Sequence, residues 1–190
     1  MPMNGATMQS YKVAFAMLVA LSTSGAGQDA VAQTEQVAGN CDVALADLSN
    51  RNLQGCDFQG RDLKGKRFDG ADLRGALLIQ ADLSGASLVK ANLHEANLTA
   101  AKLVGANLQE ATLHDAIITD ADLTKANLSS AKAKRADFSR SRLTGVNWLG
   151  THVINAALNK TTDLDCSVFE SAYSAARAKV DPPCVSSGFR

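Results

Sequence analysis

Residues 91–130 read ANLHE-ANLTA-AKLVG-ANLQE-ATLHD-AIITD-ADLTK-ANLSS, a repeat of five residues that decides the fold. The repeat extends in both directions, from Ala46 to Gly150, over 21 consecutive frames. The central residue of each frame is Leu, Phe, Ile or Trp, except in the frame centred on Ala133. Two residues before the centre, alanine is unbroken from Ala71 to Ala136.

A period of five fits neither regular element. Each residue of an α-helix advances by about 100°, so the leucines would spiral around the helix and form no stripe. Faces alternate with a period of two in a strand, so a step of five would move each leucine to the other face. A chain that turns a corner every five residues keeps the alanine and the central residue of every frame inside. The repeat therefore predicts a solenoid.

This pattern resembles the pentapeptide-repeat family, over Ala46 to Gly150 and, through the weaker frames THVIN and AALNK, to about Lys160. The resemblance implies an all-β fold, a right-handed quadrilateral β-helix in which four repeats form one square coil of 20 residues. About five coils are expected between residues 46 and 160, stacked at the spacing of a β-sheet, about 4.8 Å.

The central residues of stacked coils should form four interior ladders. Burial of each large side chain in a ladder should stabilise the folded protein by about 1.5–3 kcal/mol. Ala133 predicts a local void unless Leu113 or Phe138 fills it. The predicted core comprises Leu73, Leu78, Leu83, Leu88, Leu93, Leu98, Leu103, Leu108, Leu113, Ile118, Leu123, Leu128 and Phe138.

The residue before the centre is Asp or Asn in 13 of the 21 frames. Both side chains can accept hydrogen bonds from backbone groups two residues on, and both tolerate tight turns. Because they recur with the repeat, we interpret them as residues that form the corners of the coil and not as a reactive site.

The N-terminal residues 1–32 differ from the rest of the chain. Lys12 precedes an apolar run of nine residues, which is followed by small residues and candidate cleavage sites after Ala26 and Ala32. This order is typical of a secretory signal peptide, and nine apolar residues are too few to span a bilayer. The alternative is a buried N-terminal helix. We expect an exported protein, periplasmic or secreted, without a stable membrane anchor.

Both ends of a solenoid need capping segments, because an open coil exposes its interior and unpaired backbone. Residues 33–45 are the expected N-terminal cap, and Arg51, Arg61 and Lys66 interrupt the alanine column beside it. Residues 161–190 are the expected C-terminal cap. There, residues 167–170 form a capping box that predicts a helix, stopped by the prolines at 182 and 183.

All four cysteines follow the candidate cleavage sites, and an even number in an exported chain favours disulfides. Cys166 and Cys184 flank the predicted capping helix and are expected to pair. A bond between Cys41 and Cys56, three repeats apart, would join neighbouring sides of adjacent coils and is a second possibility.

One group of side chains could bind a metal. His94 and His114 are 20 residues apart and should stack on one outward column, with Glu95 and Asp115 beside them. Imidazoles and carboxylates are ligands for divalent metals. The simpler interpretation is a solvated surface ladder, and the basic residues that flank the column disfavour a cation. We therefore expect no metal and no cofactor.

Composition and motifs limit the function. Nineteen basic residues balance nineteen acidic ones, so neither a nucleic-acid footprint nor a strongly acidic nucleic-acid mimic is indicated. We find no catalytic motif, and a filled solenoid lacks a natural cleft. The outward apolar residues Leu77, Ile79 and Ile117 share one side, which is the first candidate for a partner surface.

Three hypotheses follow. The first is a non-enzymatic structural or protein-interaction module with an unidentified protein partner. The second comes from the resemblance: cytoplasmic members of the family mimic DNA and protect DNA gyrase from quinolones. The third, a metal- or ligand-binding carrier, rests on the two histidines alone.

Overall fold

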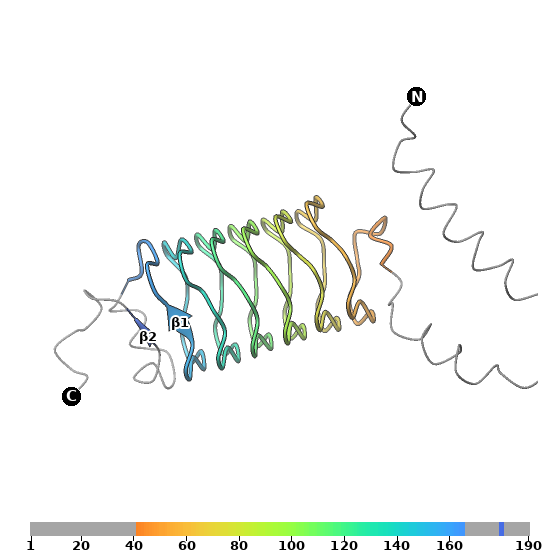
Figure 1. The fold of residues 1–190 in the computed structure, drawn as a ribbon. Helices are drawn as coiled ribbons and strands as arrows, with labels where there is room; N and C mark the ends of the chain where they lie inside the picture. Colours follow the sequence, from red (N-terminus) through yellow and green to blue (C-terminus); the bar gives the residue numbers. More distant parts are fainter. Residues whose placement is uncertain (1–40, 166–178, 181–190) are drawn as a thin grey trace, which may run out of the picture. The chain divides into compact units, whose positions relative to one another are not determined.

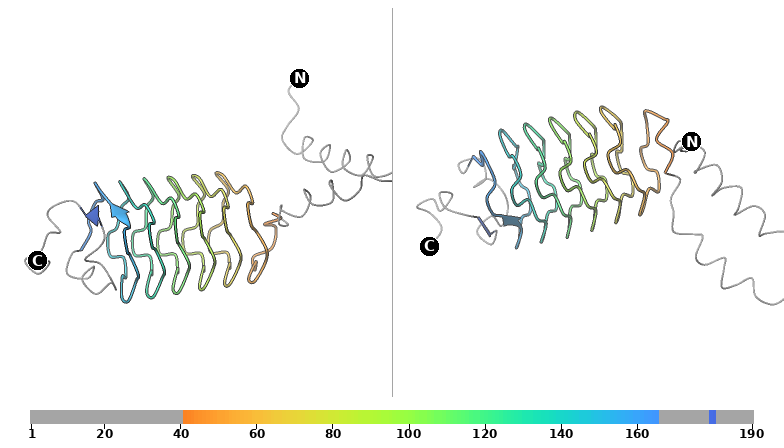
Figure 2. Two further views of the ribbon diagram at one scale, coloured as in Figure 1. Left: turned by 60° about the horizontal axis from the view of Figure 1, so that its bottom comes forward. Right: turned by 45° about the horizontal axis from the view of Figure 1, so that its top comes forward.

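The computed structural model describes residues 41–165 and 179–180, and the chain from Asp47 to Thr162 forms a solenoid of stacked square coils (Figures 1 and 2). Parallel β-bridges join each residue that precedes a central position to the residue 20 positions later. Four ladders result, each with six members. Thr162 and the weak frames that follow Gly150 take part in them, so the solenoid extends beyond the strong repeat.

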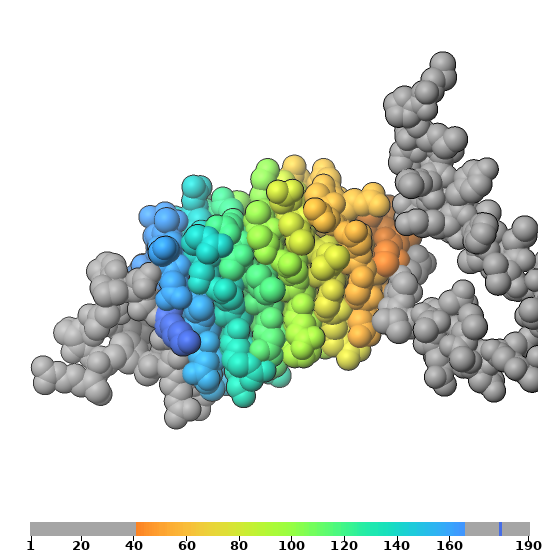
Figure 3. Space-filling model, in the orientation of Figure 1, coloured from red at the N-terminus to blue at the C-terminus, as the bar shows by residue number. Residues whose placement is uncertain are grey.

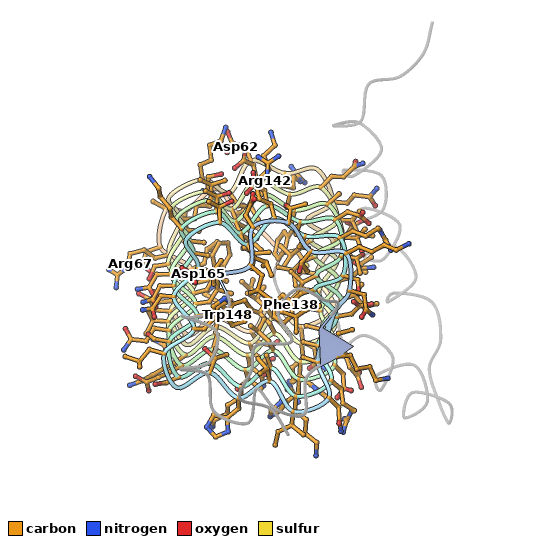
Figure 4. The ribbon with its side chains drawn as sticks, turned by 90° about the vertical axis from the view of Figure 1, so that its left-hand side faces the viewer. Asp62, Arg67, Phe138, Arg142, Trp148 and Asp165 are labelled. Atoms are coloured by element: carbon orange, nitrogen blue, oxygen red, sulfur yellow. A yellow bond between two sulfur atoms is a disulfide. The ribbon has the colours of Figure 1, made fainter. Side chains whose placement is uncertain are left out.

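We number the four sides by the central residues of the first coil: side one contains Leu48, side two Leu53, side three Phe58 and side four Leu63. Central residues and the alanine column point inward. The thirteen residues of the predicted core are all at most 1% exposed, and the interior seen along the axis is filled with side chains (Figure 4).

Each corner is a tight turn, and in most frames a backbone hydrogen bond within the turn closes it. At the first, the amide N–H of Arg51 donates to the carbonyl of Leu48, and Asn50 at the third position of the turn has φ 58°. A positive φ at this position is the geometry of a type II turn. All 23 frames between residues 46 and 160 share it, with nine glycines and fourteen other residues there. At Gly70 a Cβ would lie 2.5 Å from Asn50 Oδ1, so a larger residue there would require the Asn50 side chain to rotate away.

The Asp and Asn side chains accept hydrogen bonds from the amide two residues on, as predicted, but the residues themselves precede the corners and do not form them. They lie in the β-bridges, one residue before the centre, and reach forward to cap the turn. Asn97 Oδ1, for example, accepts the amide N–H of Thr99 at 3.0 Å. In such a frame the other four amide groups donate to backbone carbonyls, three of them in neighbouring coils. All five donors of the repeat are then satisfied, as a buried or half-buried backbone requires.

One turn is closed by a neighbouring coil instead. Ser141 occupies the alanine column and is fully buried. Its hydroxyl donates to the carbonyl of Ile118 at 2.5 Å and accepts the amide N–H of Ala121 at 3.0 Å. The hydroxyl therefore replaces the turn's own hydrogen bond, so a serine is accommodated inside an otherwise apolar column.

At the N-terminal end, a disulfide joins Cys41 to Cys56, with Cα atoms 5.5 Å apart. Cys56 takes an alanine-column position on side three and is buried. Lys66, at the alanine-column position of side one, turns outward and donates from Nζ to the carbonyl of Leu45 at 2.9 Å. The bond thus attaches the segment before the first coil to that coil.

At the C-terminal end, the chain adds one more strand to side three. Strand β1, Ala157–Leu158, pairs in parallel with β2, Lys179–Val180, and the amide N–H of Lys179 donates to the carbonyl of Ala156. The expected capping helix and the Cys166–Cys184 bond lie outside the described residues. Because residues 179–180 form a strand, a helix that continues to the prolines at 182 and 183 is excluded.

Candidate functional site

The histidine column of side two is the first candidate site, and its donor atoms have other partners. His94 Nδ1 lies 3.0 Å from the carbonyl oxygen of His114 and Nε2 lies 3.4 Å from Glu95 Oε1. His114 Nδ1 accepts the amide N–H of Lys134 at 3.3 Å. This contact caps a turn whose own frame lacks an Asp or Asn, so the imidazole has a structural role.

Asp115 faces an arginine. Arg135, one coil further on, donates from Nε and Nη2 to the two carboxylate oxygens of Asp115, both at 2.5 Å. This two-point hydrogen bond lowers the pKa of Asp115 below its usual range. Within residues 41–165 and 179–180, no group of three or more His, Cys, Asp or Glu side chains could hold a metal ion.

The environment of His114 favours the neutral ring. Partial burial, followed by the positive charges of His94, Lys132 and Lys134, lowers its pKa below the usual value, although Asp115 acts in the opposite direction. A neutral ring is also what the hydrogen bond from Lys134 requires, because only an unprotonated Nδ1 accepts.

Arginine–aspartate pairs occur on several sides of the solenoid. Beside Asp115 with Arg135, Arg140 binds both oxygens of Asp120, and Arg74 binds Asp72 with a closest distance of 2.6 Å. Hydrogen bonds from these arginines lower the pKa values of Asp72 and Asp120. Acidic side chains therefore do not present an uninterrupted negative column.

The carboxylates and amides that recur with the repeat are engaged with backbone. In each such contact, as at Asn97, one side-chain oxygen accepts a hydrogen bond from the amide N–H two residues on.

The face seen in the space-filling view is closely packed and without a hollow (Figure 3). In the described part of the chain, no helix is long and apolar enough to cross a membrane.

Apolar residues remain exposed at few outward positions. Leu77 and Ile117 on side three are 39% and 43% exposed, and Val104 on side four is 37% exposed. Sequence reasoning missed Leu149, which is 63% exposed on side one. Its position one residue after the centre of the frame VNWLG was sufficient to identify it as outward.

Comparisons with known proteins agree with this architecture. A family model for pentapeptide repeats matches with eight copies, over residues 41–76, 52–89, 67–105, 91–129 and 121–159. No curated protein sequence matches the chain.

Among solved structures, HetL, a pentapeptide repeat protein involved in heterocyst differentiation regulation from Nostoc sp. strain PCC 7120, is 31% identical with a TM-score of 0.36. That match covers 60% of this chain and only 59% of HetL. A pentapeptide repeat protein from the Arabidopsis thaliana thylakoid lumen is 30% identical over 66% of this chain and 79% of its own, with a TM-score of 0.32.

QnrB1, a plasmid-mediated fluoroquinolone resistance protein, is 19% identical in one of its trypsin-treated variants, over 72% of this chain and 78% of its own, with a TM-score of 0.42. The eight repeat copies, which span most of the described residues, determine the assignment. The chain belongs to the pentapeptide-repeat family, and its solenoid is a right-handed quadrilateral β-helix.

Proposed function

We propose that this protein is a non-enzymatic structural or protein-interaction module that acts outside the cytoplasm. The observation that carries the proposal is the filled interior: the core residues are at most 3% exposed, from Leu48 to Leu158. A solenoid without an internal cavity offers its outer sides to partners, and most of the polar side chains on those sides are engaged in turn caps and ion pairs.

Export is supported by two independent features. The first is the charged, apolar and small-residue order of residues 1–32, with cleavage after Ala26 or Ala32. The second is the disulfide between Cys41 and Cys56, which closes the N-terminal end of the solenoid. Structural disulfides persist in oxidising compartments and are rare in the cytosol.

Fractionation of cells that express the full chain tests the proposal. We expect the protein in the periplasm or medium, with an intact mass that corresponds to a mature N-terminus directly after Ala26 or Ala32. A variant with Leu18→Arg, which interrupts the apolar run, should remain in the cytoplasm at full length. A wild-type protein that stays cytoplasmic and keeps its N-terminus would disprove export.

The gyrase-protecting hypothesis makes a different prediction. A mimic of DNA presents rows of negative charge, whereas here arginines bind Asp72, Asp115 and Asp120. We therefore expect no protection of gyrase from a fluoroquinolone in a supercoiling assay with the purified protein. Protection at stoichiometric concentration would contradict the interaction-module proposal and restore the mimic. The carrier hypothesis is not retained, because His114 and Asp115 are engaged by Lys134 and Arg135.

A further inference from the structure

The amide N–H that follows each central residue finds its acceptor in one of two places. In most frames the acceptor is the Asp or Asn two residues earlier, as at Asn97. In two frames without such a residue, a side chain one coil earlier takes its place. Asp69 accepts from the amide of Val89 at 3.1 Å. His114 accepts from the amide of Lys134 at 3.3 Å. A turn is therefore capped either by its own frame or by the coil before it.

Ile154 has neither kind of acceptor. Its frame carries His152 at the position of the Asp or Asn, and the residue one coil earlier in its column is Lys134, whose ammonium group can only donate. In the described part of the chain, no group accepts a hydrogen bond from the amide of Ile154. The other uncapped amides of the described solenoid have no lysine or arginine one coil earlier in their column; Gln59 precedes Ile79, for example.

Two lysines stand beside this amide without a carboxylate. Lys132 and Lys134 are two residues apart on side two, about 6–7 Å between Cα atoms in an extended chain, so both side chains point outward. Both are exposed, and neither ammonium group has an ion pair within the described residues. The three arginines of the same coil are each paired with an aspartate one coil earlier. The lysines instead follow Thr112 and His114, which carry no carboxylate.

We propose that side two binds a phosphate or sulfate group between two coils, at a site formed by the ammonium groups of Lys132 and Lys134 and the amide N–H of Ile154. A β-bridge joins Lys132 to His152, and the amide of Arg135 donates to the carbonyl of Ile154 at 2.9 Å, so the two coils are held in register. The two lysines, Ile154 and His152 thus mark the corners of one small area.

The chemistry of these groups selects an oxyanion. Lysine binds phosphate as a point charge, and backbone N–H groups form anion-binding sites. Two ammonium groups balance the double negative charge of a phosphate or sulfate ion, whereas a single carboxylate would leave one lysine unbalanced. A metal cation is disfavoured, because both lysines are positively charged and the amide only donates.

The surroundings of the site contain no competing acid. The corner residues on either side of the lysines are Ser130 and Arg135, and those of the next coil are Gly150 and Asn155. Arg135 occupies both carboxylate oxygens of Asp115, one coil earlier. The site does not depend on where the protein acts, so its failure would leave the proposed export and interaction role standing.

Titration of the isotope-labelled protein with inorganic phosphate, followed by NMR of the backbone amides, tests the site. We expect a saturable shift of the Ile154 amide at millimolar phosphate, and Lys134→Gln should weaken binding by about tenfold. Lys125→Gln is the matched control. Lys125 is exposed and without an ion pair in the described chain, but Asp122 caps the turn of its frame, so binding should be unchanged.

A second pair of variants tests the missing acceptor without removing a lysine. His152→Asn places an amide oxygen where Asn147 accepts the N–H of Leu149 at 3.1 Å, so it should cap Ile154 and weaken phosphate binding by about tenfold. His152→Gln also removes the imidazole but does not form this turn, and it should bind phosphate as the wild type does.

Three results would overturn the proposal: no saturable shift of the Ile154 amide, equal weakening by Lys125→Gln and Lys134→Gln, or equal effects of the two His152 variants. Repeating the titration with a sulfated disaccharide and with phosphatidylglycerol vesicles identifies the source of the group. Binding of one carrier that Lys134→Gln weakens assigns the group to a glycan or a lipid, and binding of phosphate alone assigns a free oxyanion.

Discussion

The indole of Trp148 packs edge-on against the phenyl ring of Phe138, with ring centroids 5.5 Å apart and planes at 80°. The two residues lie on opposite sides of the square, ten positions apart in sequence, and meet inside the solenoid (Figure 4). Ala133, on side two, is fully buried. The void expected at Ala133 stays a prediction.

Truncation of this pair should be costly. Trp148→Ala removes a fully buried indole and should lower the free energy of unfolding by about 3–5 kcal/mol, since the cavity relaxes only in part. Urea unfolding measures the loss. Leu149→Ala, at the exposed neighbouring position, should change the stability by less than about 0.5 kcal/mol. Equal losses in both variants would contradict the assigned register.

A charge in the ladder should be worse than a cavity. Leu98 is fully buried at the middle of the solenoid, and Leu98→Asp places an unpaired carboxylate there. We expect the free energy of unfolding to fall by more than about 4 kcal/mol, a size that only severe core defects reach. Asn97→Asp, one residue earlier and outward, retains the turn cap and should remain folded. Thermal unfolding followed by circular dichroism distinguishes the two variants.

The turn caps make a smaller and testable contribution. Asn97→Ala leaves the amide of Thr99 without its acceptor at 3.0 Å, so the protein should lose about 1 kcal/mol. Thr112 occupies the same position in a frame without such a cap, and Thr112→Ala is the control, with an expected change of less than about 0.5 kcal/mol. Identical losses would indicate that the caps do not stabilise the turns.

The N-terminal disulfide should stabilise the solenoid, because it joins residues 15 positions apart and so restricts the unfolded chain. Replacing Cys41 and Cys56 together by alanine should lower the free energy of unfolding by about 3 kcal/mol. Alanine suits position 56, which lies in the alanine column, so the loss measures the bond and not a packing defect. Peptide mapping without reduction should recover the Cys41–Cys56 pair and, as the sequence predicts, a separate Cys166–Cys184 pair. Thiols detected at any of the four would contradict the corresponding assignment.

His114 should make stability depend on pH. Its pKa is lowered in the folded protein from an ordinary value of 6.5, so the unfolded chain binds the proton more readily. The contribution is therefore fully present above pH 6.5 and decreases as the pH falls below it. His114→Gln removes this term, so its unfolding free energy should fall less between pH 7.5 and pH 5.5 than that of the wild type. Parallel curves for the two proteins would exclude the effect.

The period of five residues by itself determined the architecture. It identified which residues point inward. A chain with an apolar side chain at every fifth position can bury all of these side chains only if it turns a corner after every repeat. The outward exposure of Leu77 and Ile117 followed from the same frame.

Only the tertiary structure decided what depends on contacts between coils. The register of 20 residues places His114 on the amide of Lys134 and Asp115 on Arg135, which turns an apparent metal site into a turn cap and an ion pair. The position of the Asp and Asn residues in the β-bridges and the hydroxyl of Ser141 across a turn likewise arise from neighbouring coils. A local pattern specifies which way a side chain points, whereas its partner 20 residues away is fixed only when the coils stack.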